Sequence, residues 1–385
     1  MFNFIASVAF PKGNDLFNTI VFGLLEGLTG LVGYGVAIIF FAIILRLFMM
    51  PLDVLNKYFT KRNAAKTAEF KEEDDELKAQ FGADPLKYMA ARREMHRRNG
   101  HNPMISNLVM FGNMVVTMMV FIAVFGCLSQ ISTLNINNQS KALHAVYVKH
   151  EAAGTLEEGA IEGKTFREEI NFVYGEYTEG FLWVHNFFRP DTWESKRPSL
   201  KQFKRAVGDD TIPEATYNTI FSIDGETGKY SGTGLSKKNS HGWNGYLIFF
   251  LIVPATMYFS MQVNMSVMQK KKAAESKKEA EVGYSMRQAK AQADPNAMPQ
   301  VDPQKMMKYM KFMMPAMMII FVINSASAFA LYIAVGAIMQ TSLGLGSNAI
   351  IDKVIKKQEQ KKKDAEPNHP VINPHTRYFK KRSVK

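Results

Sequence analysis

Long stretches without a charged residue constrain this 385-residue chain more than any other feature. Four such runs cover residues 27–52, 99–140, 239–269 and 312–351, and Arg46 is the only charge in any of them. Each run holds enough apolar residues to cross the roughly 30 Å of hydrocarbon in a bilayer as a helix. Acidic and basic residues are grouped between the runs instead. This pattern is typical of a helical membrane protein and not of a chain that folds around a soluble core.

The last of these runs is too long for one crossing. At about 1.5 Å per residue, its 40 residues would extend about 60 Å as a single helix, twice the hydrocarbon thickness. The polar sequence Asn324-Ser-Ala-Ser327 is the expected break. The chain is therefore predicted to be an all-α membrane protein with five transmembrane helices. The expected spans are roughly 32–51, 107–129, 245–267, 310–324 and 328–347.

Lys and Arg in the connecting segments predict the orientation, because cytoplasmic loops carry the excess of these residues. Segments 52–101, 268–311 and 352–385 hold 11, 10 and 11 Lys/Arg against 9, 5 and 4 acidic residues. Segment 132–242 holds 13 Lys/Arg against 15 acidic residues. We therefore expect the first three segments in the cytoplasm and the fourth outside, with the amino terminus outside and the carboxyl terminus in the cytoplasm.

This topology divides the chain into five parts, and two of them carry local signals for helices. Residues 15–31 have the spacing of an amphipathic helix at the outer surface, although an extension of the first span also fits. Gly82 offers a helix stop, and Asp84-Pro85 supplies a cap and a first-turn proline for the next helix. The expected parts are an outer amphipathic segment (1–31), the first two spans with a cytoplasmic helical hairpin (32–131, hairpin 53–100), an extracytoplasmic insertion (132–242), the last three spans with a cytoplasmic loop (243–351, loop 268–309), and a basic cytoplasmic tail (352–385).

The extracytoplasmic insertion mixes aromatic residues, glycines and balanced charge, which predicts a small surface domain with some strand. Trp183 and Trp193, with Phe187 and Phe188, fit an aromatic belt at the outer leaflet. The segment lacks cysteine, so we expect no disulfide in it. Across the chain, the eight histidines form no metal-ligand pattern, and we find no phosphate loop or nucleophile motif. We therefore expect no enzyme, no metal and no cofactor.

Arg46 is the first candidate for a functional residue. A guanidinium near the bilayer centre costs about 2.5 to 3.5 kcal/mol on insertion scales, so such charges usually face protein or water and mark function. Only four residues separate Arg46 from Pro51, however, so its side chain also has the length to reach the nearer interface. Position alone leaves both interpretations open.

Five sequence motifs occur along the chain in a characteristic order. GYGVAIIFFAIILRLFMMPL at 33–52 is followed by a charged hairpin with GADPLKYMAARREMHRRNGHNP and then by an apolar span. The later motifs are FLWVHNFFRPDTW at 181–193, DPQKMMKYMKFMMP at 302–315 and FALYIAVGAIMQTSL at 329–343. Over about 250 of the 385 residues, this ordered set resembles the shared core of the YidC/Oxa membrane-protein insertases. The resemblance implies a five-span core without a large amino-terminal periplasmic domain, in the plasma membrane of a bacterium.

The resemblance also implies a function, that of an insertase and chaperone for integral membrane proteins. In this family five helices enclose a hydrophilic groove open to cytoplasm and lipid, and Arg46 matches the arginine inside it. The charge would attract acidic residues in the tail of a nascent membrane protein while the apolar helix of that protein enters lipid. Other polar residues in the spans are candidates for the same groove, although hydrogen bonds between helices also explain them. They are Asn113, Thr117, Gln262, Asn324, Tyr332 and Gln340.

The basic tail, expected to be disordered by itself, is predicted to contact a partner in the cytoplasm. Its cations suit ribosomal RNA or anionic lipids, and a topology role with no specific partner also fits. The candidate residues are Lys361, Lys362, Lys363, Lys380, Lys381 and Arg382. The insertase is expected to act alone or beside the SecYEG secretion channel, and no DNA partner is expected. The alternative function is a small-anion transporter or channel that uses Arg46, although no convincing internal repeat is present.

Overall fold

The regular secondary structure is helical in the part of the chain that the structure describes. In this computed structural model, the described residues are 9, 12, 16–81, 84–98, 103–193, 196–263 and 303–365. Among them, β-structure is limited to isolated bridges such as Ile161–Lys164, outside any strand. The all-α prediction is therefore confirmed, whereas the strand expected in the insertion is wrong for these residues. Local sequence explains the difference, because Thr165 with Glu168 and Ser199 with Gln202 form capping boxes that begin helices there.

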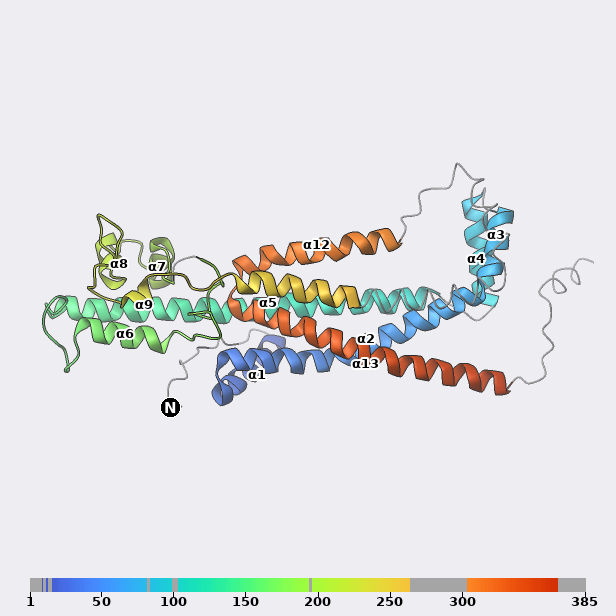
Figure 1. Ribbon diagram of the computed structural model, residues 1–385, viewed down its shortest axis with the longest axis horizontal. Coiled ribbons are helices and arrows are strands. Elements are labelled where there is room, and N and C mark those ends of the chain that lie inside the picture. The colour runs from blue at the N-terminus through green and yellow to red at the C-terminus, as the bar shows by residue number, and fades with distance from the viewer. Residues whose placement is uncertain are drawn as a thin grey trace, which may run out of the picture. The chain divides into compact units, whose positions relative to one another are not determined.

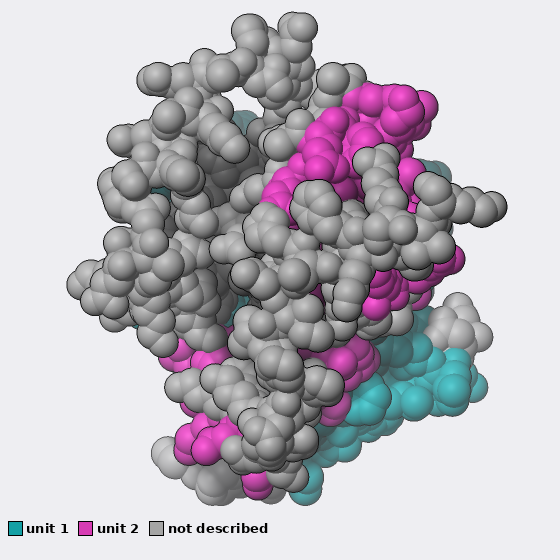
Figure 2. All heavy atoms as spheres, turned by 90° about the vertical axis from the view of Figure 1, so that its right-hand side faces the viewer, with its two compact units in different colours: residues 1–49, 116–342 teal, residues 50–115, 343–385 magenta. Residues whose placement is uncertain are grey.

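The chain divides into two compact units, which Figure 2 colours separately. Unit 1 contains residues 1–49 and 116–342, and unit 2 contains residues 50–115 and 343–385. Three long helices contribute residues to both units. They are α2 (Tyr34–Glu69), α5 (Pro103–Ala152) and α13 (Ser327–Ala365).

Three helices in the described part of the chain are long and apolar enough to cross a membrane, namely Tyr34–Arg62, Phe111–Ala152 and Ser327–Ile355. They contain most of the first, second and fifth predicted spans. Shorter apolar helices at Ile248–Val263 and Pro315–Asn324 lie within the third and fourth. The predicted break in the last uncharged run is confirmed, because α12 (Pro303–Asn324) ends where expected and α13 begins at Ser327 (Figure 1).

The amino-terminal amphipathic segment is a helix of its own, α1 (Leu16–Val32). Gly33 separates it from α2 by adopting a left-handed backbone conformation with φ +83°, which residues other than glycine rarely adopt. Within α1, the buried Val21, Phe22 and Leu25 share one face and pack into the apolar core of unit 1. The structure therefore shows a separate helix and not a continuous extension of the first span, and the position of α1 at the outer surface stays a prediction.

The apolar core of unit 1 is formed where α1, α2, α5, α13 and the helix Ile248–Val263 meet. Ile38 and Phe41 of α2, Leu128 of α5, Val253 and Phe329 are each buried almost completely in it. Burying side chains of this size removes each from water or lipid contact and fills the space between helices at close-packed density. This core places the segments with the predicted site residues Arg46 and Tyr332 in the same unit.

A 13-residue segment, residues 179–191, holds the beginnings of three core helices, and we call it the clasp. Its Glu179 carboxylate accepts hydrogen bonds from the first two N–H groups of α2, at Tyr34 (2.6 Å) and Gly35 (3.2 Å). The carbonyl of Arg189 accepts both the N–H (2.9 Å) and the hydroxyl (2.7 Å) of Ser327 at the start of α13. These groups satisfy backbone donors that a helix start leaves unpaired.

Asp191 performs the same role for the helix Ile248–Val263. Its Oδ1 accepts hydrogen bonds from the N–H groups of Tyr246 (2.8 Å) and Leu247 (3.2 Å). Its Oδ2 accepts from the N–H of Phe249 (2.8 Å) and from Nε1 of Trp183 (3.0 Å). A buried carboxylate with four donors is stable in an apolar setting, because each donor replaces a water molecule. The clasp therefore holds the starts of α2, α13 and this helix together.

A second, smaller core lies beside the carboxyl-terminal part of α5, and Figure 1 shows α6 running along that helix. Leu143 and Val146 of α5 pack there against Ile170 of α6 and Phe203 of α7. The boundary predicted at residue 132 therefore lies inside one continuous helix. The short helices of this region are α6 (Phe166–Glu176), α7 (Leu200–Val207), α8 (Glu214–Ile220) and α9 (Lys237–Ser240).

Unit 2 contains the predicted charged hairpin, formed by α3 (Lys71–Phe81) and α4 (Pro85–Arg98). Asp84 caps α4 as expected by accepting hydrogen bonds from the N–H groups of Leu86 and Lys87, both at 3.2 Å. The segment 53–69 continues α2 and is not part of the α3 helix.

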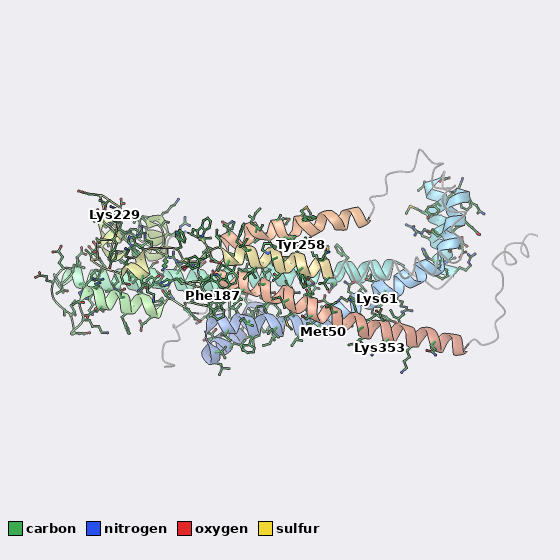
Figure 3. All side chains as sticks on the ribbon, viewed as in Figure 1. Met50, Lys61, Phe187, Lys229, Tyr258 and Lys353 are labelled. Carbon is green, nitrogen blue, oxygen red and sulfur yellow. The ribbon has the colours of Figure 1, made fainter. Side chains whose placement is uncertain are left out.

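In the same unit, α2 is linked to α13. Lys57 donates hydrogen bonds to Gly344 and Ser347, and Lys61 pairs with Asp352 at 3.1 Å. Figure 3 labels Lys61 and Lys353 on these neighbouring stretches. These contacts join parts of unit 2 that are almost 300 residues apart in sequence.

Replacing Asp191 should destabilise the protein more than replacing other acidic residues of unit 1. Asp191→Ala leaves four donors without an acceptor in a buried site, and we expect a loss of about 3–5 kcal/mol. The readout is the Tm of the detergent-solubilised protein. Asp210→Ala is the matched control because Asp210 is exposed. Equal Tm values for the two variants would show that the clasp does not hold the helix start.

The clasp residue His185 makes stability depend on pH. Burial, followed by the positive charges of Lys196 and Lys238, lowers its pKa from 6.5 to about 4. Between these pH values the unfolded chain binds a proton that the folded chain does not, so stability falls as pH drops from about 6.5 towards 4. After screening by solvent, we expect a loss of about 1–2 kcal/mol. Urea unfolding at pH 7 and pH 5 should show a smaller difference in His185→Gln than in a His144→Gln control.

Candidate functional site

The guanidinium of Arg46 lies against the backbone of α13 at Gly336. A Cβ atom on Gly336 would lie 3.3 Å from Nε and 3.5 Å from Nη2 of Arg46. The missing side chain at this position therefore makes room for the guanidinium beside α13. Arg46 itself is half-buried, and its side chain is directed towards a neighbouring helix of the same unit.

The polar atoms of Arg46 are not neutralised by the described part of the chain. Its Nε is buried and has no hydrogen-bond partner there, and none of the ion pairs found among described residues includes it. A buried donor without a partner costs about 1–3 kcal/mol, and more for a charged group. Such a group is uncommon in folded proteins and requires a specific explanation. An arrangement of this kind is suited to receiving an anionic group from outside the chain.

Tyr332 adjoins this site, one helical turn before Gly336 on α13. Its phenol is close enough to Arg46 for the two to interact electrostatically. The ring is buried, stacks on Phe329 with centroids 6.2 Å apart, and lies 6.1 Å from the ring of Phe41. Aromatic contacts therefore fix the tyrosine beside the arginine. Two of the predicted site residues, Arg46 and Tyr332, are thus brought together.

The other predicted polar residues of unit 1 do not contact Arg46 among the described interactions. Asn324 is exposed at the end of α12 and donates its amide to the carbonyl of Ile320 in its own helix (2.8 Å). Gln340, one turn after Gly336, and Gln262 are exposed, and Thr117 is half-buried. Exposure on a membrane-spanning helix is compatible with contact to lipid or to a passing chain. Their assignment to a common groove stays a prediction.

Asn113 belongs to unit 2 and has an acidic neighbour there. Its Nδ2 donates to Oδ1 of Asp53 at 3.4 Å, while its own Oδ1 is buried without a described partner. Asp53 was not a candidate in the sequence analysis, because it lies just beyond the uncharged run. This pair makes Asn113 part of a polar contact between α2 and α5 within unit 2.

The basic tail lies mostly outside the described residues. Helix α13 continues to Ala365, so residues 356–363 are helical and the expectation of disorder is wrong for them. Nothing is described of the side chains of Lys361, Lys362 and Lys363. Lys380, Lys381 and Arg382 lie outside the described part of the chain, and the role of all six in binding stays a prediction.

Three residues that shape the site and its frame were missed by sequence reasoning. Gly336 follows Tyr332 at a spacing of four, and a small residue one turn from a polar aromatic residue was an available signal. Glu179 and Asp191 are the acidic residues that flank the FLWVHNFFRP motif, shortly before an expected span. Their capping partners lie up to 145 residues away in sequence, so no local pattern identified them. Among described residues, no cluster of three or more His, Cys, Asp or Glu is suited to a metal ion.

Apolar helices of membrane-spanning length, with an arginine held between two of them, define an integral membrane protein. The model of the 60Kd inner membrane protein family matches residues 24–358, and the chain belongs to this family. It is the YidC/Oxa family of membrane protein insertases, so the resemblance found in the sequence is confirmed. The matched range includes the clasp, Arg46 and Gly336. A comparison with curated proteins finds no match.

Gly336 should be needed for the position of Arg46. Gly336→Leu places a side chain where the guanidinium lies, and overpacking of this kind typically costs about 1–3 kcal/mol. We expect Gly336→Leu to reduce membrane-protein insertion by reconstituted liposomes several-fold. Gly346→Leu is the matched control on the same helix, because a Cβ there meets nothing within 4 Å. Equal insertion by both variants would contradict the close packing of Arg46 on Gly336.

Proposed function

We propose that this chain inserts and helps fold membrane proteins through a hydrophilic groove in which Arg46 attracts the acidic tail of a substrate. The observation that carries the proposal is the guanidinium of Arg46, with its buried and unpartnered Nε beside Gly336. A protein of the insertase family has nascent membrane proteins as substrates. Such substrates must move polar tails across hydrocarbon, where unpaired charges and backbone groups are expensive.

The depth of Arg46 supports this role over an interfacial position of its side chain. Gly336 is nine residues after the start of α13, which corresponds to about 14 Å along a helix. The clasp holds the starts of α13 and α2 together, so the guanidinium lies about half a hydrocarbon thickness from that end. A charge at this depth is compatible with a hydrated groove.

The clasp also supports the proposed five-span topology. In a chain that crosses five times, the first, third and fifth spans begin on the same side of the membrane. The starts of α2, the helix Ile248–Val263 and α13 are all bound by residues 179–191. With the Lys/Arg distribution, this favours an amino terminus outside and a carboxyl terminus in the cytoplasm. The proposed membrane, from the family resemblance, is the bacterial plasma membrane.

In this mechanism the arginine lowers the free energy of an intermediate in transfer, and no covalent bond changes. An acidic residue of the substrate tail would replace water beside the guanidinium and supply the acceptor that Arg46 lacks. The apolar helix of the substrate would meanwhile move along exposed apolar side chains. Phe48 of α2 is 76% exposed, and Leu251 and Phe259 of the helix Ile248–Val263 are 65% and 64% exposed. Those side chains suit contact with lipid before and after the substrate passes.

Partners of the cytoplasmic side belong to the same proposal. The basic tail would bind the ribosome or anionic lipid through phosphate contacts, and the SecYEG channel would supply substrates for joint insertion. A small-anion transporter uses the same unpaired arginine, but membership of the insertase family favours membrane proteins as substrates.

Removing the charge of Arg46 should impair insertion of substrates with acidic tails. A charge pair 4 Å apart near a protein surface is worth up to about 4 kcal/mol, and hydration reduces this, so we expect a loss of about tenfold. Arg46→Lys should keep part of the activity because the charge remains. The measurement is the rate at which purified protein in liposomes inserts a single-span substrate, with either an acidic or a neutralised tail.

Arg62→Ala is the matched control, since Arg62 is exposed on the same helix beyond the apolar stretch. It should insert both substrates at the wild-type rate. Arg46→Ala should slow only the substrate with the acidic tail. If it slows both substrates equally, the arginine has a structural role and the electrostatic proposal is wrong.

A further inference from the structure

Three aromatic side chains near the clasp form a cluster that is not part of either core. Trp193, Trp243 and Tyr246 are 60%, 57% and 61% exposed. The rings of Trp193 and Trp243 have centroids 6.1 Å apart, and those of Trp243 and Tyr246 have centroids 6.4 Å apart. We call these three residues the aromatic patch. Large apolar side chains that are exposed in a cluster often mark a site of contact with a membrane or another molecule.

The aromatic patch differs in most of its residues from the aromatic belt expected from sequence. Phe187 and Phe188 are buried in the core of unit 1, so their assignment to a membrane surface is wrong. Figure 3 labels Phe187 within this unit. Trp183 is partly buried and donates its Nε1 to Asp191. Of the four residues expected in the belt, only Trp193 is in the aromatic patch.

The patch lies at the level where membrane-spanning helices begin. Tyr246 is two residues before the helix Ile248–Val263, and its N–H is bound by Asp191 of the clasp. The N–H of Gly245 donates to the carbonyl of Thr192, and this hydrogen bond connects the two chain segments that carry the patch. The clasp binds the starts of α2 and α13 as well. Tryptophan and tyrosine at such a level typically lie among lipid headgroups.

Basic side chains flank the aromatic patch. The N–H of Lys196 donates to the carbonyl of Gly242, next to Trp243, and Nζ of Lys196 donates to the carbonyl of Lys238 (2.8 Å). Lys237 and Lys238 are exposed, and no ion pair among the described residues includes these three lysines. After burial, the charges of Lys196 and Lys238 contribute to the lowered pKa of His185. Both lysines therefore lie close to the His185 ring. The lysines therefore concentrate positive charge beside the patch.

We propose that the aromatic patch and its flanking lysines bind the headgroup of an anionic glycerophospholipid in the leaflet on the clasp side. Indole and phenol rings of the patch enter the region between headgroups and acyl chains. The ammonium groups of Lys196 and Lys238 then contact the phosphodiester, for which they are complementary in charge. The occupant is a lipid because apolar rings and cations meet at one surface, next to the start of a membrane-spanning helix.

This lipid site has a mechanical consequence. Binding at the clasp fixes the depth of the three helix starts in the membrane, and through them the depth of Arg46. The inference rests on the fact that this chain belongs to a family of integral membrane proteins. It does not require the proposed role of Arg46 in insertion. Loss of lipid binding and loss of the electrostatic role are therefore separate outcomes, measured with different variants.

Tryptophan fluorescence tests the proposal directly, because the chain has three tryptophans and two are in the patch. The full-length protein is reconstituted in phosphatidylcholine vesicles that contain a minor fraction of brominated lipid, which quenches nearby tryptophans. Brominated phosphatidylglycerol should quench more strongly than brominated phosphatidylcholine at the same fraction. A lysine near an anionic membrane surface gives about a fivefold preference, so the local enrichment should be of this order or larger. The difference between lipids should disappear in Trp193→Phe/Trp243→Phe, where only Trp183 reports.

The lysines are tested with matched charge changes. Lys196→Gln/Lys238→Gln should bring the two brominated lipids to equal quenching, and Lys238→Gln alone should give an intermediate value. Lys238→Gln also guards against misfolding, because that side chain is exposed. The control Lys201→Gln/Lys229→Gln removes the same charge from exposed positions in α7 and in the turn after α8, and should retain the preference. Equal quenching by both lipids in the wild type, or a preference that survives Lys196→Gln/Lys238→Gln, would overturn the proposal.

Discussion

The hydrogen bonds that the clasp makes to helix starts are the interaction on which unit 1 depends. Every helix begins with N–H groups that have no partner in the helix itself. Near hydrocarbon, where water is scarce, each unpaired group costs several kcal/mol. Glu179, Asp191 and the carbonyl of Arg189 satisfy such groups at three helices. The two carboxylates are negative and helix starts carry positive partial charge. The caps therefore also interact favourably with the helix dipoles.

The position of Arg46 follows from this arrangement. Capping brings the starts of α2 and α13 to one segment, and the core residues Phe41 and Phe329 keep the two helices adjacent beyond it. The guanidinium then reaches α13 where Gly336 leaves space. The capping atoms of the clasp accept hydrogen bonds within the chain, whereas Nε of Arg46 has no partner among the described residues. A buried charged donor without a partner requires a specific explanation, and for Arg46 the proposed explanation is an acidic group of the substrate.

Sequence predicted the features that depend on local composition. Uncharged runs identified the membrane class, the Asn324–Ser327 break matched the end of α12, and Asp84 capped α4 as expected. The length of α5 was not predicted, because hydropathy marks where a helix leaves the membrane but does not mark where the helix ends. The clasp was also missed, since Glu179 binds a helix start 145 residues away. Capping at such distance has no local sequence signal.

The site itself was predicted only in part for the same reason. A lone charge in an apolar run identified Arg46 without any knowledge of its surroundings. Its neighbour on α13, Gly336, has no polar atom in a side chain and was not a candidate. Asn324, by contrast, was a candidate because it is polar, yet its amide binds a carbonyl of its own helix. The sequence therefore identifies an isolated charge more reliably than it identifies the small residues that leave room for that charge.

Shared capping also determines where unit 1 resists deformation. Moving one helix start away from residues 179–191 breaks its own caps and disturbs the segment that binds the other two. Asn244 strengthens this coupling, because its side chain bonds to the N–H and carbonyl of Asn186 and to the carbonyl of Pro190. Separating the three helix starts therefore requires breaking several hydrogen bonds of the clasp at once. The proposed groove would therefore stay closed at the clasp, because these hydrogen bonds hold the three helix starts together.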